Sequence, residues 1–191
     1  MVIGSHNSWS YLKPKYWLLR PFAFMARCQE VDIKTQYEKY NVRCFDLRIK
    51  FDKNRLPEVR HGFMTYKITS KQLSKDLDYI NSKGDCYVRI LLEVRNKRQY
   101  TIEQIELFKE YCQRISWQYQ DIKFWCGRNL YNWNVVCDFG FEPSCEEKYS
   151  SVCPPKLIDD WYPKLYAKRK NKENIQEGTD KDILLIDFVD I

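Results

Sequence analysis

The chain contains two histidines, His6 and His61, and each ends a short segment with the pattern of a β-strand. Histidine is the residue whose ordinary pKa, about 6.5, allows it to accept and to donate a proton near neutral pH. Polar residues also lie at or near the ends of three further strand-like segments: Asp46 and Arg48, Glu93, and Asp187. Because catalytic groups gather at the carboxyl ends of the strands in a parallel α/β barrel, these residues predict one acid–base site.

The alternation of side chains around Asp46 predicts which way the polar groups point. Successive side chains in a strand lie on opposite faces of the sheet. Asp46 and Arg48 therefore share a face with the small Cys44, while the apolar residues between them share the face suited to packing against helices. Burying an aspartate and an arginine is costly unless they pair or serve a ligand. The two residues belong either to a functional site or to a buried ion pair that closes the barrel.

The rest of the chain alternates strand-like and helical segments, which predicts an α/β fold. Strands are expected over 2–6, 42–51, 57–60, 86–94, 122–126, 134–138 and 183–189. Helices are expected over 29–40, over 70–83 with Gly84 as the stop, from Thr101 with Gln104 as its capping box, and within 154–178.

Composition bounds the class of protein. The 191 residues are 44% hydrophobic, 30% charged and 16% aromatic, which predicts one folded domain over 1–191 and excludes a disordered chain. No apolar run reaches the roughly 18 residues of a membrane span, and residues 1–6 lack the basic and apolar regions of a secretory signal. We expect a cytoplasmic protein by default, with secretion or a place in a virus particle as alternatives.

The formal net charge of +6 favours anionic partners: phosphate esters, an acidic membrane surface or nucleic acid. Part of the charge lies in one run, Lys164, Lys168, Arg169, Lys170 and Lys172, which is more typical of a solvated face or tail. No nucleic-acid-binding motif accompanies it, so we expect no nucleic-acid partner.

Eight cysteines are many for this length, and none forms the C-x-x-C spacing of a structural zinc site. Without a secretory signal we expect reduced, mostly buried thiols. Disulfides among Cys137, Cys145 and Cys153 are the alternative.

Several of these segments together resemble the X domain of phosphatidylinositol-specific phospholipase C. The first motif of that family stands here as Gly4-Ser5-His6-Asn7-Ser8, and the second as Gln36 followed by Asn41-Val42-Arg43-Cys44-Phe45-Asp46-Leu47-Arg48. A third motif appears as His61-Gly62. Two later strands of the family are matched by Ile90-Leu91-Leu92-Glu93 and by Leu184-Leu185-Ile186-Asp187-Phe188. The close resemblance covers about residues 3–95.

The resemblance implies a compact, distorted TIM-type barrel. Its substrate would be the phosphodiester of a lipid headgroup such as phosphatidylinositol, and cleavage would proceed through a cyclic phosphate. His6 would be the general base and His61 the general acid, with Asp187 orienting His6 and Asp46 orienting His61. Arg48 would bind the phosphate and stabilise the charge that develops on it.

The family also implies a choice about metal. Its calcium-dependent members have a ligand asparagine at the position of Asn7 and acidic residues at those of Asp46, Arg48 and Glu93. Here Arg48 places a fixed cation inside that set. We therefore expect no cofactor, as in the bacterial metal-independent type, with Ca²⁺ bound by Asn7, Asp46 and Glu93 as the alternative.

Substrate specificity is less clearly marked. Asn7 and Glu93 are candidate substrate-binding residues, and Arg128, near the end of a strand, is either a substrate contact or a surface arginine. TIM barrels typically have about 250 residues, with about 200 near the lower end, so a chain of 191 predicts trimmed helices or an incomplete barrel.

The segment from Trp9 to Phe24 mixes six aromatic residues with Lys13, Lys15 and Arg20. In the family fold it lies beside the mouth of the active site. Aromatic and basic residues together suit a peripheral contact with an anionic membrane, and ordinary loop packing is the alternative.

Three other functions stay open. The enzyme could act on another glycerophosphodiester or on a glycan-phosphate. The domain could instead be catalytically silent and bind phosphate headgroups, or it could be a structural component of a larger assembly.

Overall fold

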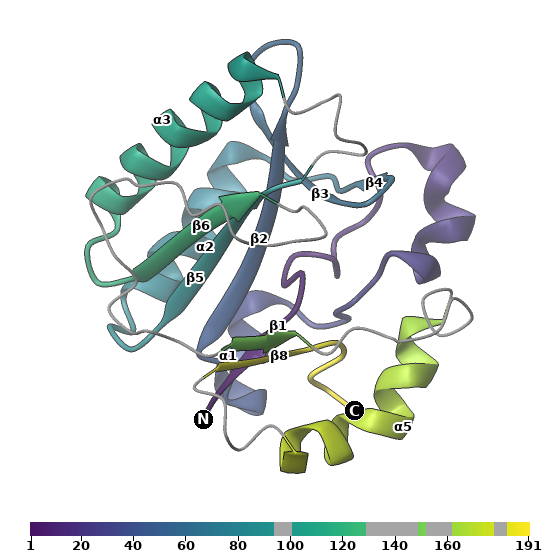
Figure 1. Ribbon diagram of the computed structural model, residues 1–191. Helices are drawn as coiled ribbons and strands as arrows, with labels where there is room; N and C mark the ends of the chain where they lie inside the picture. Colours follow the sequence, from purple (N-terminus) through teal and green to yellow (C-terminus); the bar gives the residue numbers. More distant parts are fainter. Residues whose placement is uncertain (94–100, 129–148, 152–161, 178–182) are drawn as a thin grey trace.

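The structure is a computed structural model and describes residues 1–93, 101–128, 149–151, 162–177 and 183–191 (Figure 1). Its elements are β1 (Val2–Ser5), the 3-10 helix η1 (Trp17–Met25), α1 (Ile33–Tyr40), β2 (Cys44–Phe51), β3 (Pro57–His61), β4 (Met64–Thr65), α2 (Ser70–Asn81), β5 (Tyr87–Leu92), α3 (Ile102–Gln118), β6 (Lys123–Arg128), β7 (Tyr149–Ser151), α5 (Pro163–Glu177) and β8 (Ile183–Ile186).

The sheet is parallel along the path β6-β5-β2-β1-β8-β7. The first and last strands of the chain are therefore neighbours. β2 is the longest strand, and its two halves have different partners on one edge. Cys44 and Phe45 pair with β1, whereas Ile49–Phe51 pair with the antiparallel strand β3. The carboxyl ends of β1 and β8 consequently lie beside the middle of β2.

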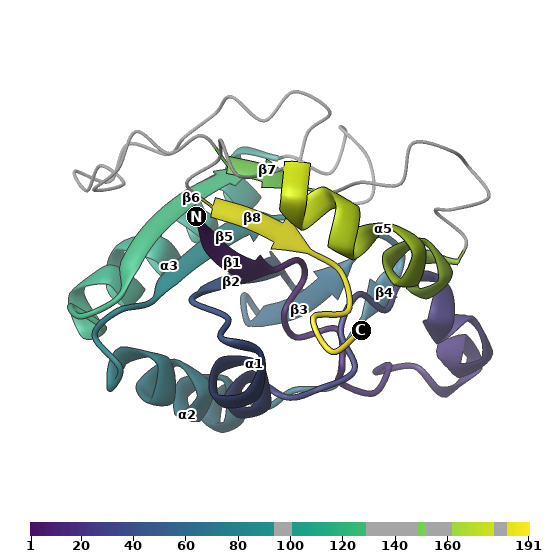
Figure 2. The same ribbon diagram turned by 90° about the horizontal axis from the view of Figure 1, so that it is seen from below.

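The two faces of the sheet differ in what covers them. Phe45, Leu47 and Ile49 of β2 belong to the large core that also includes residues of α2 and α3, and these helices lie along one side of the sheet (Figures 1 and 2). Cys44 instead forms a small cluster with Ile183 and Leu185 on the other face. The predicted alternation along this strand is confirmed.

Gly4 shows how closely β1 lies against its neighbours. A Cβ atom at this position would approach Leu185 Cδ2 to 2.4 Å and Cys44 Cβ to 3.0 Å. Since real Cβ atoms do not tolerate the shorter of these contacts, a larger residue here would push β1 away from β8. The glycine therefore keeps the strands that carry the site in register.

Three helices begin directly after a capping residue, and the first of them starts at Ile33 instead of the predicted residue 29 because Asp32 provides its cap. Asp32, Thr69 and Thr101 each accept a hydrogen bond from the backbone N–H three residues later. The capping box predicted at Thr101 forms only in part, because the Gln104 side chain binds both backbone groups of Phe51 instead. This pair of contacts joins the start of α3 to the end of β2.

The expected α/β fold is confirmed. A closed barrel is not shown, because β6 and β7 end the parallel path and do not pair with each other in the described part of the chain. The strand predicted over 134–138 and the alternative disulfides of Cys137, Cys145 and Cys153 lie outside the described residues. The prediction of a single domain is not tested. Within the described ranges, no helix combines the length and the apolar character needed to cross a bilayer.

Candidate active site

His6 and Asp187 meet where the first and last strands of the chain end. His6 follows β1 and Asp187 follows β8, and the N–H of His6 donates to the Ile186 carbonyl at 2.9 Å. His6 Nδ1 lies 2.7 Å from Asp187 Oδ1. Because the carboxylate accepts, Nδ1 carries the proton and Nε2 keeps its lone pair. The predicted contact between these two residues is present.

Gln29 fixes the two strand ends relative to each other. Its side-chain amide donates to the carbonyls of His6 and Ile186 at 3.1 and 2.9 Å. Its carbonyl oxygen accepts from the N–H of Val189 at 3.1 Å. This fully buried side chain therefore holds the chain on both sides of Asp187 against the end of β1.

Arg48 is the centre of the polar network. Its guanidinium donates to Asp46 at 2.9 Å and to Glu93 at 3.0 Å, and it contacts Nε2 of His6. Although burial lowers it, the carboxylates of Asp46 and Glu93 raise the pKa of Arg48 above its ordinary value. Arg48 is therefore a fixed cation beside the nitrogen of His6 that carries the lone pair.

Asp46 is fully buried and lies among donors. Oδ2 accepts from Arg48 and from the N–H of Asn7 at 2.9 Å, and Oδ1 accepts from Arg89 at 2.8 Å. Burial raises the pKa of this carboxyl, but the charges of Arg48 and Arg89 outweigh burial and hold it well below its usual range. Asp46 is thus ionised and has the two arginines as counter-ions.

His61 lies opposite His6, with ring centroids 5.8 Å apart and ring planes at 85°. The prediction that Asp46 orients this ring is wrong. His61 Nδ1 donates instead to the backbone carbonyl of Ala26 at 2.9 Å, and Asp46 is engaged by the two arginines. Burial lowers the pKa of His61, Glu93 raises it, and Arg48 and His6 lower it further.

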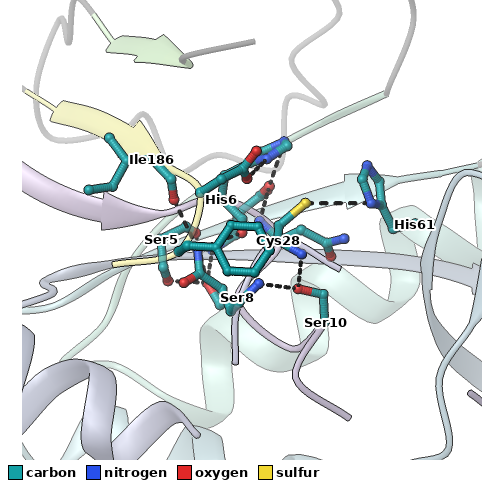
Figure 3. A network of polar contacts seen from close by, with 12 residues as sticks. Ser5, His6, Ser8, Ser10, Cys28, His61 and Ile186 are labelled. Carbon is teal, nitrogen blue, oxygen red and sulfur yellow. Dashed lines mark hydrogen bonds and ion pairs between the residues drawn. The ribbon is translucent and has the colours of Figure 1, made fainter. Parts of the chain in front are cut away.

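The segment 5–10 joins the site to the sheet (Figure 3). Ser8 Oγ donates to the Ser5 carbonyl at 2.8 Å and accepts from the N–H of Asp46 at 2.7 Å. Ser10 Oγ accepts from the N–H groups of Cys28 and Gln29, both at 2.9 Å. These serines, all buried, hold the loop after β1 against β2 and against the loop that carries Cys28.

The other predicted site residues are placed as follows. Glu93 follows β5 and accepts from Arg48 and from the N–H of Gly62. Asn7 is fully buried with a φ of 47°, and neither polar atom of its side chain has a hydrogen-bond partner among the described residues. Arg128 is the last residue of β6 and pairs with Leu92 along the backbone, while its side chain lies outside what the structure describes.

The oxygen atoms of Asn7, Asp46 and Glu93 do not fit a calcium ion. Calcium takes six to eight oxygen ligands, yet the Arg48 guanidinium lies between Asp46 and Glu93 and donates to both carboxylates. An ion at this position would have to displace a cation held by two buried ion pairs. The two carboxylates are therefore better suited to pairing with Arg48 than to binding calcium.

Arg89 is a site residue that the sequence analysis missed. It is 1% exposed and belongs to β5, where it pairs in register with Asp46 of β2. Its Nε donates to Asp46 Oδ1. A signal was present, because a single arginine interrupts an otherwise apolar strand on the face that also carries Glu93.

An exposed apolar surface, which we call the η1 surface, lies beside the site. Four side chains of η1 are 71, 64, 51 and 48% exposed: Trp17, Leu18, Phe22 and Phe24. Phe24 stacks on Tyr162 at the start of α5, with ring centroids 5.8 Å apart. η1 ends at Met25, directly before Ala26, whose carbonyl holds His61. Trp9, by contrast, is fully buried and donates to Asp76 at 2.9 Å, so the predicted membrane segment divides into a core part and an exposed part.

No family model and no curated protein sequence matches the chain. Solved structures of a phosphatidylinositol-specific phospholipase C from Staphylococcus aureus do match. A double mutant of that enzyme has 20% identity and a TM-score of 0.51, over 66% of this chain and 47% of the other. A second structure, which concerns modulation of that enzyme's membrane binding, has 18% identity and a TM-score of 0.47, over 68% and 47%. The chain spans about half the length of these structures, and the first likeness shows a shared fold over the matched part.

Proposed function

We propose that the protein is a phosphodiesterase of the phospholipase C type that acts on a phosphatidylinositol-like phosphodiester. One observation carries the proposal: His6, oriented by Asp187, lies opposite His61 with the Arg48 guanidinium against its free nitrogen. An acid, a base and a cation in one site are the groups that in-line transfer of a phosphoryl group requires. The likeness to the S. aureus enzyme supports the same reaction class.

In this proposal His6 is the general base. Asp187 holds the proton on Nδ1 and leaves the lone pair on Nε2, which faces Arg48. In this proposal the substrate parts that contact, and Nε2 takes a proton from a substrate hydroxyl. That hydroxyl attacks phosphorus and forms a cyclic phosphate. Asp187 also stabilises the imidazolium that results, because its carboxylate lies 2.7 Å from the ring nitrogen.

His61 is the general acid. Since Nδ1 donates to the Ala26 carbonyl, the proton given to the leaving oxygen comes from Nε2. Burial lowers the pKa of His61, which makes its protonated form a stronger acid than an ordinary imidazolium. Water could then open the cyclic product with the two roles reversed.

Arg48 stabilises the charge on phosphorus in place of a metal ion. Its bonds to Asp46 and Glu93 hold the guanidinium in one orientation before substrate arrives, and preorganised donors of this kind are the largest source of electrostatic catalysis. The reaction proposed for this site therefore needs no bound cation.

The parallel path of six strands supports a distorted TIM-type barrel as the complete architecture. Catalytic groups come from the carboxyl ends of the parallel strands β1, β8 and β5 and from the middle of β2, and TIM-type barrels place their active sites at the carboxyl ends of parallel strands. His61 instead ends the antiparallel strand β3.

The test is an assay on a panel of phosphodiesters, with phosphatidylinositol, phosphatidylcholine and a soluble glycerophosphodiester as substrates. We expect hydrolysis of the inositol lipid and a cyclic phosphate as the first product by phosphorus NMR. His6→Ala and His61→Ala should each lower the rate by roughly 10²–10⁴-fold. Inactivity on the whole panel, or variants as active as the parent, would refute the enzymatic proposal and favour a headgroup-binding domain.

We also propose that the η1 surface contacts the membrane that carries the substrate. Its four apolar side chains lie next to the chain segment that holds His61, and the exposed Arg20 of the same helix adds positive charge beside them. Lys164 is also exposed, but it is paired with Glu30. α5 packs against η1 (Figure 2), so Leu165, 59% exposed, extends the apolar area. Large apolar side chains with neighbouring cations suit an anionic lipid surface.

Vesicle sedimentation tests this contact with a matched pair of tryptophans. Trp17 is 71% exposed on the η1 surface, and Trp117 is 70% exposed on α3, away from it (Figure 1). Trp17→Ala should weaken binding to vesicles of phosphatidylcholine with phosphatidylserine by about tenfold or more, with hydrolysis of a soluble substrate unchanged. Trp117→Ala should bind as the parent does. Equal effects of the two substitutions would contradict the proposal.

A further inference from the structure

The thiol of Cys28 lies inside the site, although no step of the proposed reaction uses it. The residue is 1% exposed, and its sulfur points toward His61, with Sγ 3.7 Å from Nδ1 (Figure 3). Its backbone is fixed on both sides, because the N–H donates to Ser10 Oγ and the carbonyl accepts from the N–H of Phe188. The position of the sulfur is therefore set by the same strand ends that place the histidines.

Three different metal-ligating groups converge at this point. One ligand atom each from His6, Cys28 and Asp187 lies within 4.8 Å of the other two, and all three residues are buried. They come from the end of β1, the segment before α1 and the end of β8. A sulfur, a nitrogen and an oxygen donor form the type of set that binds zinc.

The spacing to His61 fits a fourth ligand. In a tetrahedral zinc site, a sulfur at about 2.3 Å and a nitrogen at about 2.0–2.1 Å from the metal lie about 3.6 Å apart. Cys28 Sγ and His61 Nδ1 are 3.7 Å apart. This group is separate from Asn7, Asp46 and Glu93, whose donors are all oxygen and whose carboxylates are occupied by Arg48.

We propose that Cys28, His6 and Asp187 form a binding site for Zn²⁺ or a similar soft divalent cation, with His61 able to complete it. Binding replaces protons and leaves the oxidation state of every atom unchanged. The Cys28 thiol releases its proton to solvent and binds as thiolate. The proton on His6 Nδ1 moves to Nε2, and the freed Nδ1 lone pair binds the metal beside the Asp187 carboxylate. When His61 completes the site, its Nδ1 proton likewise moves to Nε2, and its hydrogen bond to the Ala26 carbonyl is lost.

Occupancy of this site would block the proposed reaction, an expectation that rests on the proposed function. With the metal on Nδ1, His6 carries its proton on Nε2 and has no lone pair for a substrate hydroxyl. That proton also faces Arg48, so the contact between the two side chains must open. Zinc would therefore act as an inhibitor that competes with substrate.

The direct test uses cobalt as a spectroscopic probe of the full chain. One equivalent of Co²⁺ should give a thiolate-to-cobalt charge-transfer band and the visible bands of a tetrahedral site, and one equivalent of Zn²⁺ should remove them. Cys28→Ser should abolish the charge-transfer band. Cys112→Ser should leave it intact, because this equally buried thiol belongs to α3 in the helix-covered core.

Further variants make the result decisive. Replacing Cys137, Cys145 and Cys153 together with serine should leave the band unchanged, and His6→Gln should weaken Co²⁺ binding by at least about 10–100-fold, the loss that even an outer-shell partner causes. A band that survives Cys28→Ser, or no band in the parent protein, would refute the site. If Cys28→Ser does not fold, as judged by circular dichroism, the His6→Gln titration decides.

Inhibition is measured separately. Zn²⁺ should slow hydrolysis by the parent and raise its KM, and should slow Cys28→Ser much less relative to that variant's own zinc-free rate. A chain that binds cobalt but hydrolyses none of the substrates would retain the metal site and refute the proposed function. A chain that is active but gives no cobalt spectrum would refute the metal site and leave the proposed function in place.

Discussion

His6 Nδ1 and Asp187 Oδ1 lie 2.7 Å apart, although 181 positions of sequence separate the two residues. The contact depends on the parallel pairing of β1 with β8, which brings Ser5 beside Ile186 and so places the next residue of each strand at one edge of the sheet. An aspartate in this position decides which nitrogen of the histidine carries the proton.

Asp187→Asn should therefore lower kcat with little change in KM. The amide can present its NH₂ to Nδ1, which favours the tautomer with the proton on Nε2 and removes the base. We expect a loss of about 10²–10⁴-fold in kcat at neutral pH. Asp78→Asn, an exposed position on α2, is the control and should retain the parent rate. A KM effect alone would assign Asp187 to substrate binding.

Removal of divalent cations should leave the reaction intact. Arg48 lies between Asp46 and Glu93 and pairs with both carboxylates. A calcium ion at this position would need the same two carboxylates as ligands. Hydrolysis measured after dialysis against EDTA should equal the untreated rate, and added Ca²⁺ should not increase it. Activity that disappears in chelator and returns with calcium would overturn this interpretation of Arg48.

The pH dependence should identify His61 as the acid. Burial lowers the pKa of this residue, and a general acid must be protonated in the free enzyme, so kcat/KM should begin to fall below the ordinary histidine value of about 6.5 as the pH rises. Glu93 raises the pKa of His61. Glu93→Gln should therefore move this fall to still lower pH.

Glu110→Gln is the matched control for that shift, because Glu110 is exposed on α3. Its profile should coincide with that of the parent. A fall that stays at the same pH in Glu93→Gln would show that a group other than His61 donates the proton.

Asp46 should matter for stability as much as for activity. Asp46→Asn removes the buried carboxylate charge that faces both Arg48 and Arg89, while Glu93 stays bonded to Arg48. Breaking a buried ion pair typically costs about 3–5 kcal/mol of unfolding free energy. Asp85→Asn removes an exposed ion pair with Arg43 and should cost at most about 1 kcal/mol. Urea denaturation of both variants at pH 7 gives the comparison.

Acid should reduce the stabilisation from Asp46. Its pKa is lower in the folded protein than in the unfolded chain, so the contribution is complete above about pH 4–5 and is lost as the pH falls toward the folded value. The difference in unfolding free energy between the parent and Asp46→Asn should shrink accordingly between about pH 5 and the lowest pH at which both remain folded. A difference independent of pH would mean that packing, not charge, accounts for it.

Much of the site could be predicted from sequence because its side chains follow strands. The position of Asp46 and Arg48 on one face follows from the two-residue alternation of β2, and the placement of His6 and Asp187 follows from apolar strands that end in a polar residue. The expected starts of the helices agree with Thr69 and Thr101 as caps.

What sequence reasoning missed depends on contacts that carry little local pattern. The partner of His61 is a backbone carbonyl, and any residue at position 26 could provide one. Trp9 and Trp17 look alike in sequence, but the buried acceptor Asp76 holds one in the core while the other is exposed on η1. No local pattern distinguishes Cys28 from the other thiols, because its two histidine neighbours lie 22 and 33 positions away.

The pairing of β1 with β8 has a consequence for how the protein matures. Bringing β1 and β8 side by side closes a long loop, since His6 and Asp187 lie 181 positions apart, and such non-local pairings form slowly compared with helices and hairpins. Gly4, which admits β8 at close range, is therefore a determinant of when the site is assembled as well as of its shape. Appearance of the proposed activity during refolding should therefore lag behind the recovery of helix.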